Sequence, residues 1–193
     1  MNRDPEDDNQ HEKNSRTYYV DTNVLLSQYK PTDVFHRQSV IIVAALKRGE
    51  VIGYTSPLTI LEMVSFVSRN FPLKKGETPE EARNIAISKI LKEISSFRLH
   101  FSSPSGDYSL KLDSDRDVLM PAVLGNALGL STVGLKTLDL IHLGAAKYCK
   151  ETVAQLAGFV TGDSDFLEKK ILSVKIGVPF LSPEELVRIL STA

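Results

Sequence analysis

The chain contains a single cysteine, Cys149, among its 193 residues. One cysteine excludes an internal disulfide, and the lack of a cysteine neighbour at zinc-ligand spacing excludes a cysteine-based zinc site. We predict that Cys149 is a small buried side chain on a helix. The sequence also has no glycine-rich phosphate loop, internal repeat or low-complexity core, so nothing indicates a nucleotide-binding loop or a repeat architecture.

Long hydrophobic segments are missing as well. The longest continuous apolar run, residues 40–46, is far too short to span a bilayer. The first 16 residues are almost wholly polar and lack the apolar stretch of a secretory signal. We therefore expect a disordered polar tail over residues 1–16, one globular domain over residues 17–193, and a cytoplasmic protein without a membrane anchor.

Neither sign of charge is in excess, because 23 basic residues stand against 24 acidic ones. The tail holds more acids than bases, which leaves the remainder with a formal charge near +1. A nucleic-acid partner must therefore be recognised by a local patch. Three groups of lysines can supply such a patch or merely keep the surface soluble: Lys74 with Lys75, Lys136, and Lys169 with Lys170.

Strand-like and helix-like segments alternate along the chain. β-Branched and aromatic residues predict strands at 17–20, 51–55, 98–101, 158–161 and 174–180. Apolar periodicity and capping residues predict helices at 34–47, 56–70, 78–97, 135–150 and 166–173, with a last helix beginning after Ser182. Residues 102–106 are rich in turn formers, and we expect a helix within 113–130 that Pro121 interrupts or starts. This alternation predicts an α/β fold with a parallel sheet covered by helices on both faces.

Acidic residues follow two of the predicted strands. Asp21 comes directly after the first strand, and Asp163 and Asp165 follow the strand at 158–161. Ligands of parallel α/β sheets bind beyond the carboxyl ends of the strands, so these carboxylates are expected to share a site. Hard oxygen ligands of this kind favour Mg²⁺ or Mn²⁺ and a phosphate-containing substrate.

Each candidate acid also has a structural interpretation. Asp21 can cap the following helix, and Asp163 and Asp165 can be turn residues after Gly162. Glu62 falls on one helix side with Thr59, Ser65 and Arg69, which is also the pattern of a solvated polar stripe. Asp139 lies in a first helical turn, where the helix dipole favours a negative charge.

The order and surroundings of these acids are more specific than the acids alone. Four segments together resemble the PIN-domain ribonucleases, most closely the VapC-type toxin branch: Val20-Asp21-Thr22-Asn23-Val24, Ser56-Pro57-Leu58-Thr59-Ile60-Leu61-Glu62, Thr137-Leu138-Asp139-Leu140-Ile141-His142, and Thr161-Gly162-Asp163-Ser164-Asp165. The resemblance covers essentially the whole chain after the tail. It implies a three-layer α/β/α fold with a central parallel sheet and helices on both faces.

The resemblance also implies the site and its chemistry. Asp21, Glu62, Asp139 and Asp163 correspond to the family's catalytic acids around one or two Mg²⁺ or Mn²⁺ ions, and Asp165 is a candidate fifth ligand. Asn23 and Thr161 correspond to supporting polar residues. Their structural interpretation is as cap and turn residues. His142, one helical turn after Asp139, is expected to be a hydrogen-bonded helix histidine, with contact to substrate as the alternative.

The implied activity is an endoribonuclease that cleaves single-stranded RNA with a metal-activated water. The resemblance further implies an antitoxin protein as partner and a two-fold dimer. Residues 72–97 and 102–121 exceed the length of compact toxins, which leaves an RNA-processing role open. Two other classes are considered: a haloacid-dehalogenase-type phosphohydrolase, which requires an acid where this chain has Asn23, and a non-catalytic PIN-type module that binds RNA or protein.

Overall fold

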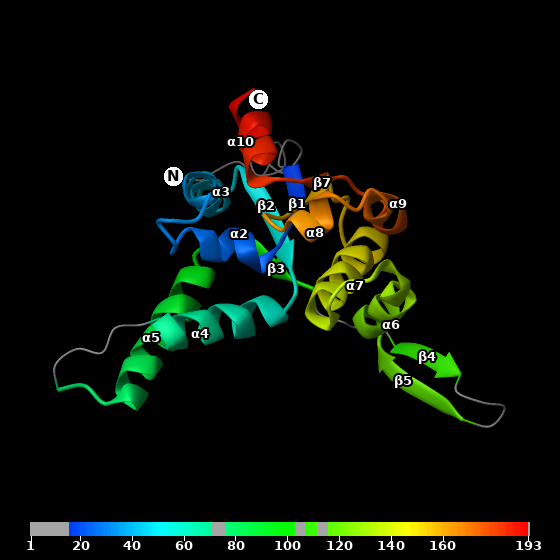
Figure 1. Cartoon of the computed structure of the whole chain (residues 1–193), viewed down its shortest axis with the longest axis horizontal. Coiled ribbons are helices and arrows are strands. Elements are labelled where there is room, and N and C mark those ends of the chain that lie inside the picture. The colour runs from blue at the N-terminus through cyan, green and yellow to red at the C-terminus, as the bar shows by residue number, and fades with distance from the viewer. Residues whose placement is uncertain (1–15, 71–75, 103–106, 112–115, 193) are drawn as a thin grey trace, which may run out of the picture.

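The centre of the molecule is a parallel five-stranded sheet (Figure 1). The computed structural model describes residues 16–70, 76–102, 107–111 and 116–192. All neighbouring strands of the central sheet run parallel, in the order β3-β2-β1-β6-β7. Its strands are β1 (Arg16–Val20), β2 (Val51–Thr55), β3 (Leu99–Phe101), β6 (Gly158–Val160) and β7 (Phe180–Leu181).

Helices cover both faces of this sheet, because alternate side chains of each strand face opposite cores. Tyr18 and Val20 of β1 belong to one core, whereas Tyr19 belongs to the other. The first core is closed by α2 (Thr22–Ser27), α3 (His36–Arg48), α4 (Leu58–Asn70), α5 (Pro79–Ile94) and α10 (Pro183–Ser191). The second is closed by α6 (Ala122–Gly129), α7 (Thr137–Thr152), α8 (Ser164–Leu167) and α9 (Ile171–Ile176). The predicted three-layer α/β/α architecture is confirmed.

Helix termini follow the predicted capping residues. Thr78 and Ser182 each form a complete capping box. The hydroxyl accepts from the backbone N–H of the glutamate three residues later, and the carboxylate of that glutamate accepts from the backbone N–H of the capping residue. Gly49 ends α3 with a left-handed φ of 76°. On α5, Ala82, Ala86, Ile90 and Ile94 are buried, whereas Ile85 is exposed.

Two segments differ from their predictions. The expected helix within residues 113–130 is α6, and Pro121 starts it, as one of the two predicted alternatives. The difference is that β4 (Asp107–Lys111) and β5 (Asp117–Pro121), which were not predicted, pair antiparallel before it. The expected strand at 174–180 begins within helix α9, which Gly177 ends with a φ of 78°, and only Phe180 at its end belongs to a strand, β7. Leu172 and Ile176 are one helical turn apart and buried, so packing against the second core outweighs the strand preference of Val174 and Ile176. The predicted helix at 166–173 is divided between α8 and α9.

Some predictions fall outside the described residues. These include the polar tail, of which only Arg16 is described, as the first residue of β1, and the lysines at 74 and 75. Cys149 is buried on α7, as predicted. No helix in the described ranges combines the length and apolar character that crossing a bilayer requires.

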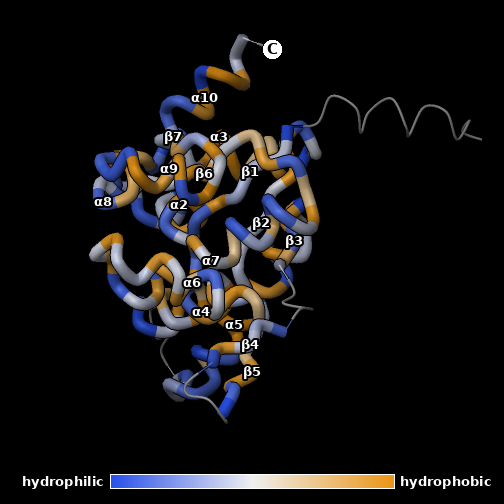
Figure 2. The backbone as a smooth tube through the Cα atoms, turned by 90° about the vertical axis from the view of Figure 1, so that its right-hand side faces the viewer, coloured by the Kyte–Doolittle hydropathy of each residue, from blue (hydrophilic) through white to orange (hydrophobic). Residues whose placement is uncertain are grey.

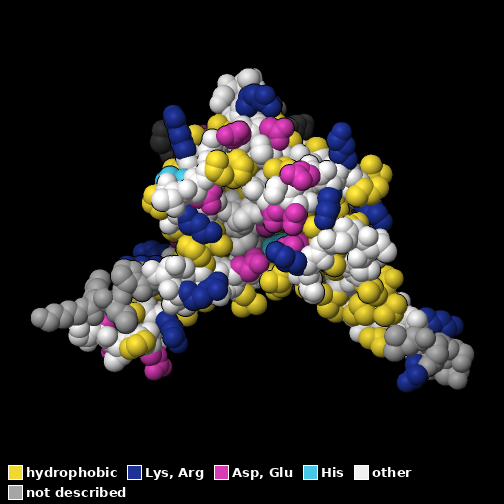
Figure 3. Space-filling model, viewed as in Figure 1, with side chains coloured by type: hydrophobic (Ala, Val, Ile, Leu, Met, Phe, Trp, Pro, Cys, Tyr) yellow, Lys and Arg dark blue, Asp and Glu magenta, His cyan; other side chains and the backbone are white. Residues whose placement is uncertain are grey.

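Two projections give the molecule its shape. The α4–α5 pair extends from one side and the β4–β5 hairpin from the other (Figure 1). The space-filling view shows that the surface is hollowed between them (Figure 3). In the perpendicular view the hairpin again lies at the end of the molecule opposite α10 (Figure 2). The carboxyl ends of β1 and β6 face this hollow.

Close packing of α6 on α7 depends on Gly144. A Cβ at this position would lie 2.3 Å from the carbonyl oxygen of Val123 and 2.8 Å from the amide nitrogen of Ala127. Because backbone atoms cannot rotate away, we expect Gly144→Ala to lower the free energy of unfolding by about 1–3 kcal/mol in urea titrations. Gly129→Ala is the matched control, since nothing lies within 4 Å of its Cβ position. Gly129→Ala should leave the free energy of unfolding unchanged or raise it by up to about 1 kcal/mol. Equal effects of both changes would contradict this packing argument.

Candidate active site

Asp21 and Asp163 are brought together by the sheet. They follow β1 and β6, which are neighbouring parallel strands, and the Asp21 N–H donates to the Val160 carbonyl at 3.0 Å. Asp21 occupies the N-cap position of α2, yet its side chain forms no capping hydrogen bond. Asp163 does cap α8, because its carboxylate accepts from the Asp165 N–H. The cap interpretation therefore fails for the Asp21 side chain. Asp163, interpreted as a turn residue, instead caps α8, and it also faces the cleft described below.

Asn23 and Thr161 hold the Asp21 carboxylate in place. The Asn23 amide nitrogen and the Thr161 hydroxyl each donate to Asp21 Oδ2 at 2.7 Å. Asn23 also donates to Thr161 Oγ1 at 3.0 Å and accepts from the Gly162 N–H at 2.9 Å. These bonds join the ends of β1 and β6 through side chains about 140 positions apart. Both residues thus make contacts beyond those of a cap or a turn.

Glu62 and Asp139 complete the acidic surroundings from two helices, α4 and α7, that cover opposite faces of the sheet. All four predicted acids line one cleft of about 440 Å³ between these helices, where Figure 3 shows acidic side chains gathered in the hollow. Cationic side chains, Lys30 and Arg69, line the same cleft. The full lining is Asp21, Thr22, Asn23, Leu26, Lys30, Glu62, Ser65, Phe66, Arg69, Leu138, Asp139, His142, Asp163 and Phe166.

His142 connects the two helices at the cleft. Its Nε2 lies 3.0 Å from Glu62 Oε2, and its Nδ1 lies 3.1 Å from the Tyr19 hydroxyl. The predicted hydrogen-bonded helix histidine is confirmed, and the ring is buried with only 3% exposed. Glu62 is thereby held by a partner 80 residues away in the sequence.

The side of α4 that carries Glu62 is a solvated stripe only in its second half, because Ser65 and Arg69 are exposed whereas Glu62 is half-buried. Thr59 is fully buried, and its hydroxyl lies 2.9 Å from that of Thr22 and 2.6 Å from that of Thr55. These bonds fix the start of α4 against β2 and α2. Ser65 and Arg69, further along the same side, line the cleft.

Titration of the site reflects burial and crowded charge. Burial raises the pKa of Asp21, and the neighbouring Glu62 charge adds to this shift, while His142 and the Thr161 hydroxyl oppose it. Burial also raises the pKa of Asp139, and the charge of Asp163 raises it further. For Glu62, burial is outweighed by hydrogen bonds from His142 and Thr22, so its pKa is lowered. Burial opposes protonation of His142, yet Glu62, Asp21 and Asp139 together raise its pKa.

The donor set fits a hard divalent cation in its chemistry. Four carboxylates share one cleft, and two of them have raised pKa values because charge is crowded and desolvated there. Within the part of the chain that the structure describes, no three His, Cys, Asp or Glu side chains are already gathered into a metal-binding cluster. The acids therefore surround the cleft without being drawn to a common point.

Other predicted residues lie elsewhere. Asp165 is exposed and is not among the residues that line the cleft, although its backbone supports Asp163. Lys136 acts on the site through its charge, which opposes the raised pKa of Asp139. Lys169 donates to the Gly134 carbonyl at 3.1 Å. Lys30 and Phe66 were not predicted as residues of the site. Arg69 was predicted to share a helix side with Glu62, and this spacing could have indicated that it lines the same cleft.

Comparison with known proteins agrees with this arrangement. The family model described as the PIN domain matches residues 18–172, which run from β1 into α9. A search among curated proteins found no match. The match extends over well more than half of the chain and includes all four acids of the cleft. The chain therefore belongs to the PIN domain family.

Proposed function

We propose that this protein is a divalent-metal-dependent endoribonuclease that cleaves single-stranded RNA. PIN domains are generally nucleases. The observation that supports the proposal most is the convergence of Asp21, Glu62, Asp139 and Asp163 on one cleft from four separate elements. We propose these four as the catalytic acids and as ligands of Mg²⁺ or Mn²⁺, with Asn23 and Thr161 in support and Asp165 as a further ligand.

Each side chain in the cleft has a part in this proposal. A divalent cation, when bound, supplies Lewis acidity toward a phosphate oxygen and makes water more acidic. Asn23 and Thr161 fix the orientation of the Asp21 carboxylate, and His142 does so for Glu62. Lys30 and Arg69 offer positive charge to the phosphate backbone at the cleft of a chain whose formal net charge is only −1.

A cleavage assay tests the proposal. Purified protein with labelled single-stranded RNA should give internal cuts when Mg²⁺ or Mn²⁺ is present and none when EDTA is in excess. The same RNA annealed to its complement is the control for strand specificity. RNA that stays intact with both metals would contradict the proposed activity.

The proposal includes the finer assignments that the resemblance implies. We propose a VapC-type toxin acting in the cytoplasm with an antitoxin protein as partner, and a single PIN-like domain over residues 17–193. The haloacid-dehalogenase alternative loses its basis with membership of the PIN family. A non-catalytic PIN-type module remains the competing function, and the assay above separates the two.

We also propose a two-fold dimer. Large apolar side chains are exposed on α3 (Val40, Ile41) and on α5 (Ile85, Leu91), which gives a second copy apolar surface to cover. Light scattering of purified protein at micromolar concentration should return twice the mass of the chain. Replacing Ile41 with Lys should shift the mass toward that of one chain if α3 forms the contact, and Ile85→Lys should do so if α5 does. A monomeric wild-type protein with intact nuclease activity would contradict the dimer.

A further inference from the structure

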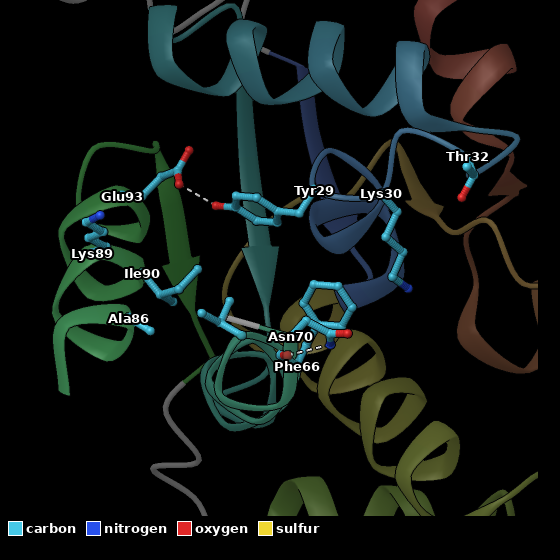
Figure 4. Close-up of a pocket in the computed structure, with 10 residues that line it drawn as sticks. Tyr29, Lys30, Thr32, Phe66, Asn70, Ala86, Lys89, Ile90 and Glu93 are labelled. Carbon is cyan, nitrogen blue, oxygen red and sulfur yellow. Dashed lines mark hydrogen bonds between the residues drawn. The ribbon is translucent and has the colours of Figure 1, made fainter. Parts of the chain in front are cut away.

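A second cavity lies beside the acidic cleft. It has a volume of about 580 Å³ and is formed between the segment that follows α2, at residues 29–32, and the helices α4 and α5 (Figure 4). Its walls include apolar side chains of α4 and α5, among them Phe66, Val67, Ala86 and Ile90. A volume in this range is typical of pockets that bind small organic groups.

The cavity and the cleft share two residues. Lys30 and Phe66 line both, and the Lys30 ammonium lies 4.9 Å from the centre of the Phe66 ring. This pair therefore stands where the two spaces adjoin. A ligand that extends from the cleft into the cavity would pass one cation and one aromatic ring on its way.

The charged groups of the cavity suit a ligand whose adjoining phosphate lies at the border with the cleft. Glu93 is the one acid among the described lining residues, and its carboxylate accepts from the Tyr29 hydroxyl and pairs with Lys47 at 3.3 Å. Its negative charge is thus already compensated. Lys30 adds positive charge to the lining where the cavity meets the cleft.

Asn70 places an amide beside the ring of Phe66. Its side-chain nitrogen donates to the Phe66 carbonyl at 2.7 Å, which holds the amide at the end of α4 (Figure 4). Amide side chains pair with the edges of nucleobases, and aromatic rings stack on their faces. One wall of the cavity thus offers groups of both kinds.

From this geometry we infer that the cavity binds a nucleobase of the RNA, adjacent to the phosphate that is cut. The base stacks on the face of Phe66 opposite the Lys30 ammonium, Asn70 contacts its edge, and the linking phosphate lies near Lys30. This inference rests on the proposed function. Binding of a base in this cavity makes cleavage depend on the nucleotide at one position, which lies at a fixed distance from the bond that is cut.

Abasic substitution tests this assignment. A single abasic nucleotide is moved one position at a time along a short single-stranded RNA. Cleavage is measured as kcat/KM, and binding is measured separately by fluorescence anisotropy in EDTA. We expect one position at which losing the base lowers both affinity and kcat/KM by about tenfold, the usual size of one base–aromatic stack.

Variants connect that position to the cavity. Phe66→Leu keeps an apolar side chain and removes the aromatic face, so the penalty at that position should disappear. Asn70→Ala, at an exposed site, should reduce the same penalty and guards against misfolding of the Phe66 variant. Tyr108→Leu, at a partly exposed aromatic of the hairpin, is the matched control and should leave the penalty unchanged.

The outcomes separate the inference from the nuclease proposal. Cleavage or binding with equal dependence on every base, or a penalty that persists in both Phe66→Leu and Asn70→Ala, overturns the pocket assignment alone. Base-selective binding without metal-dependent cutting overturns the nuclease proposal and leaves the pocket assigned. Protein that binds no RNA overturns both.

Discussion

Asp139→Asn protein should lose RNA cleavage while keeping its fold. Asp139 lies at the start of α7, partly exposed to the cleft, so an amide of the same shape disturbs little packing. The change removes one charge from the proposed cation ligands, and we expect kcat/KM to fall at least about tenfold. Asp21→Asn should have a similar effect on cleavage. The measurement is cleavage of labelled single-stranded RNA at saturating Mn²⁺, with circular dichroism to verify the fold.

Glu168→Gln provides the matched control for these variants. Glu168 is exposed at the end of α8 and does not line the cleft. Its replacement by glutamine removes one negative charge from the same side of the sheet as Asp139. Its activity should stay within about twofold of wild type, because exposed charges at a distance interact weakly. Full activity of Asp139→Asn and Asp21→Asn, resistant to EDTA, would end the metal-dependent proposal.

Mn²⁺ should raise the melting temperature of the wild-type protein. A cation that binds only the folded state stabilises it by about 2.7 kcal/mol at one hundred times its Kd. For a chain of this size that corresponds to roughly 5–10 °C. The charge of Asp163 raises the pKa of Asp139, which indicates that the two carboxylates repel each other in the absence of a cation. Differential scanning fluorimetry over a range of Mn²⁺ concentrations measures the shift.

Asp163→Asn separates metal binding from helix capping. Asparagine caps a helix as well as aspartate does, so the bond to the Asp165 N–H is preserved. We expect the variant to be at least as stable as wild type without metal and to respond less to Mn²⁺. A wild-type melting temperature unchanged by millimolar Mn²⁺ would show that the acids do not form a cation site.

Local signals predicted most of the elements correctly. The capping boxes at Thr78 and Ser182 and the glycine at 49 are set by hydrogen bonds within a few residues, so the sequence contains all the information needed. The hairpin at 107–121 was missed because Val118, Leu119 and Met120 form an apolar run that helices also contain. The helix at 171–176 was missed because strand-forming residues there obey tertiary packing.

The site was predictable where it depends on the sheet. Parallel strands end at the same edge, which places Asp21 and Asp163 together regardless of loop detail. The contact between Glu62 and His142 was not predictable in this way, since it requires α4 and α7 to approach from opposite faces of the sheet. Lys30 and Phe66 belong to no sequence motif. They line the cleft because of where the segment after α2 and the helix α4 lie in the fold, which the sequence pattern does not indicate.

The central place of β1 in the sheet has a consequence for synthesis of the chain. β1 pairs with β6, and the Asp21 carboxylate receives its bond from a threonine 140 residues later. At 5–20 residues per second, a ribosome needs on the order of 10 s to pass from one to the other. During that interval the nascent chain has an aspartate without its supporting hydroxyl and a sheet open along one edge. The hydrogen bonds that hold the Asp21 carboxylate are therefore complete only after most of the chain has been made.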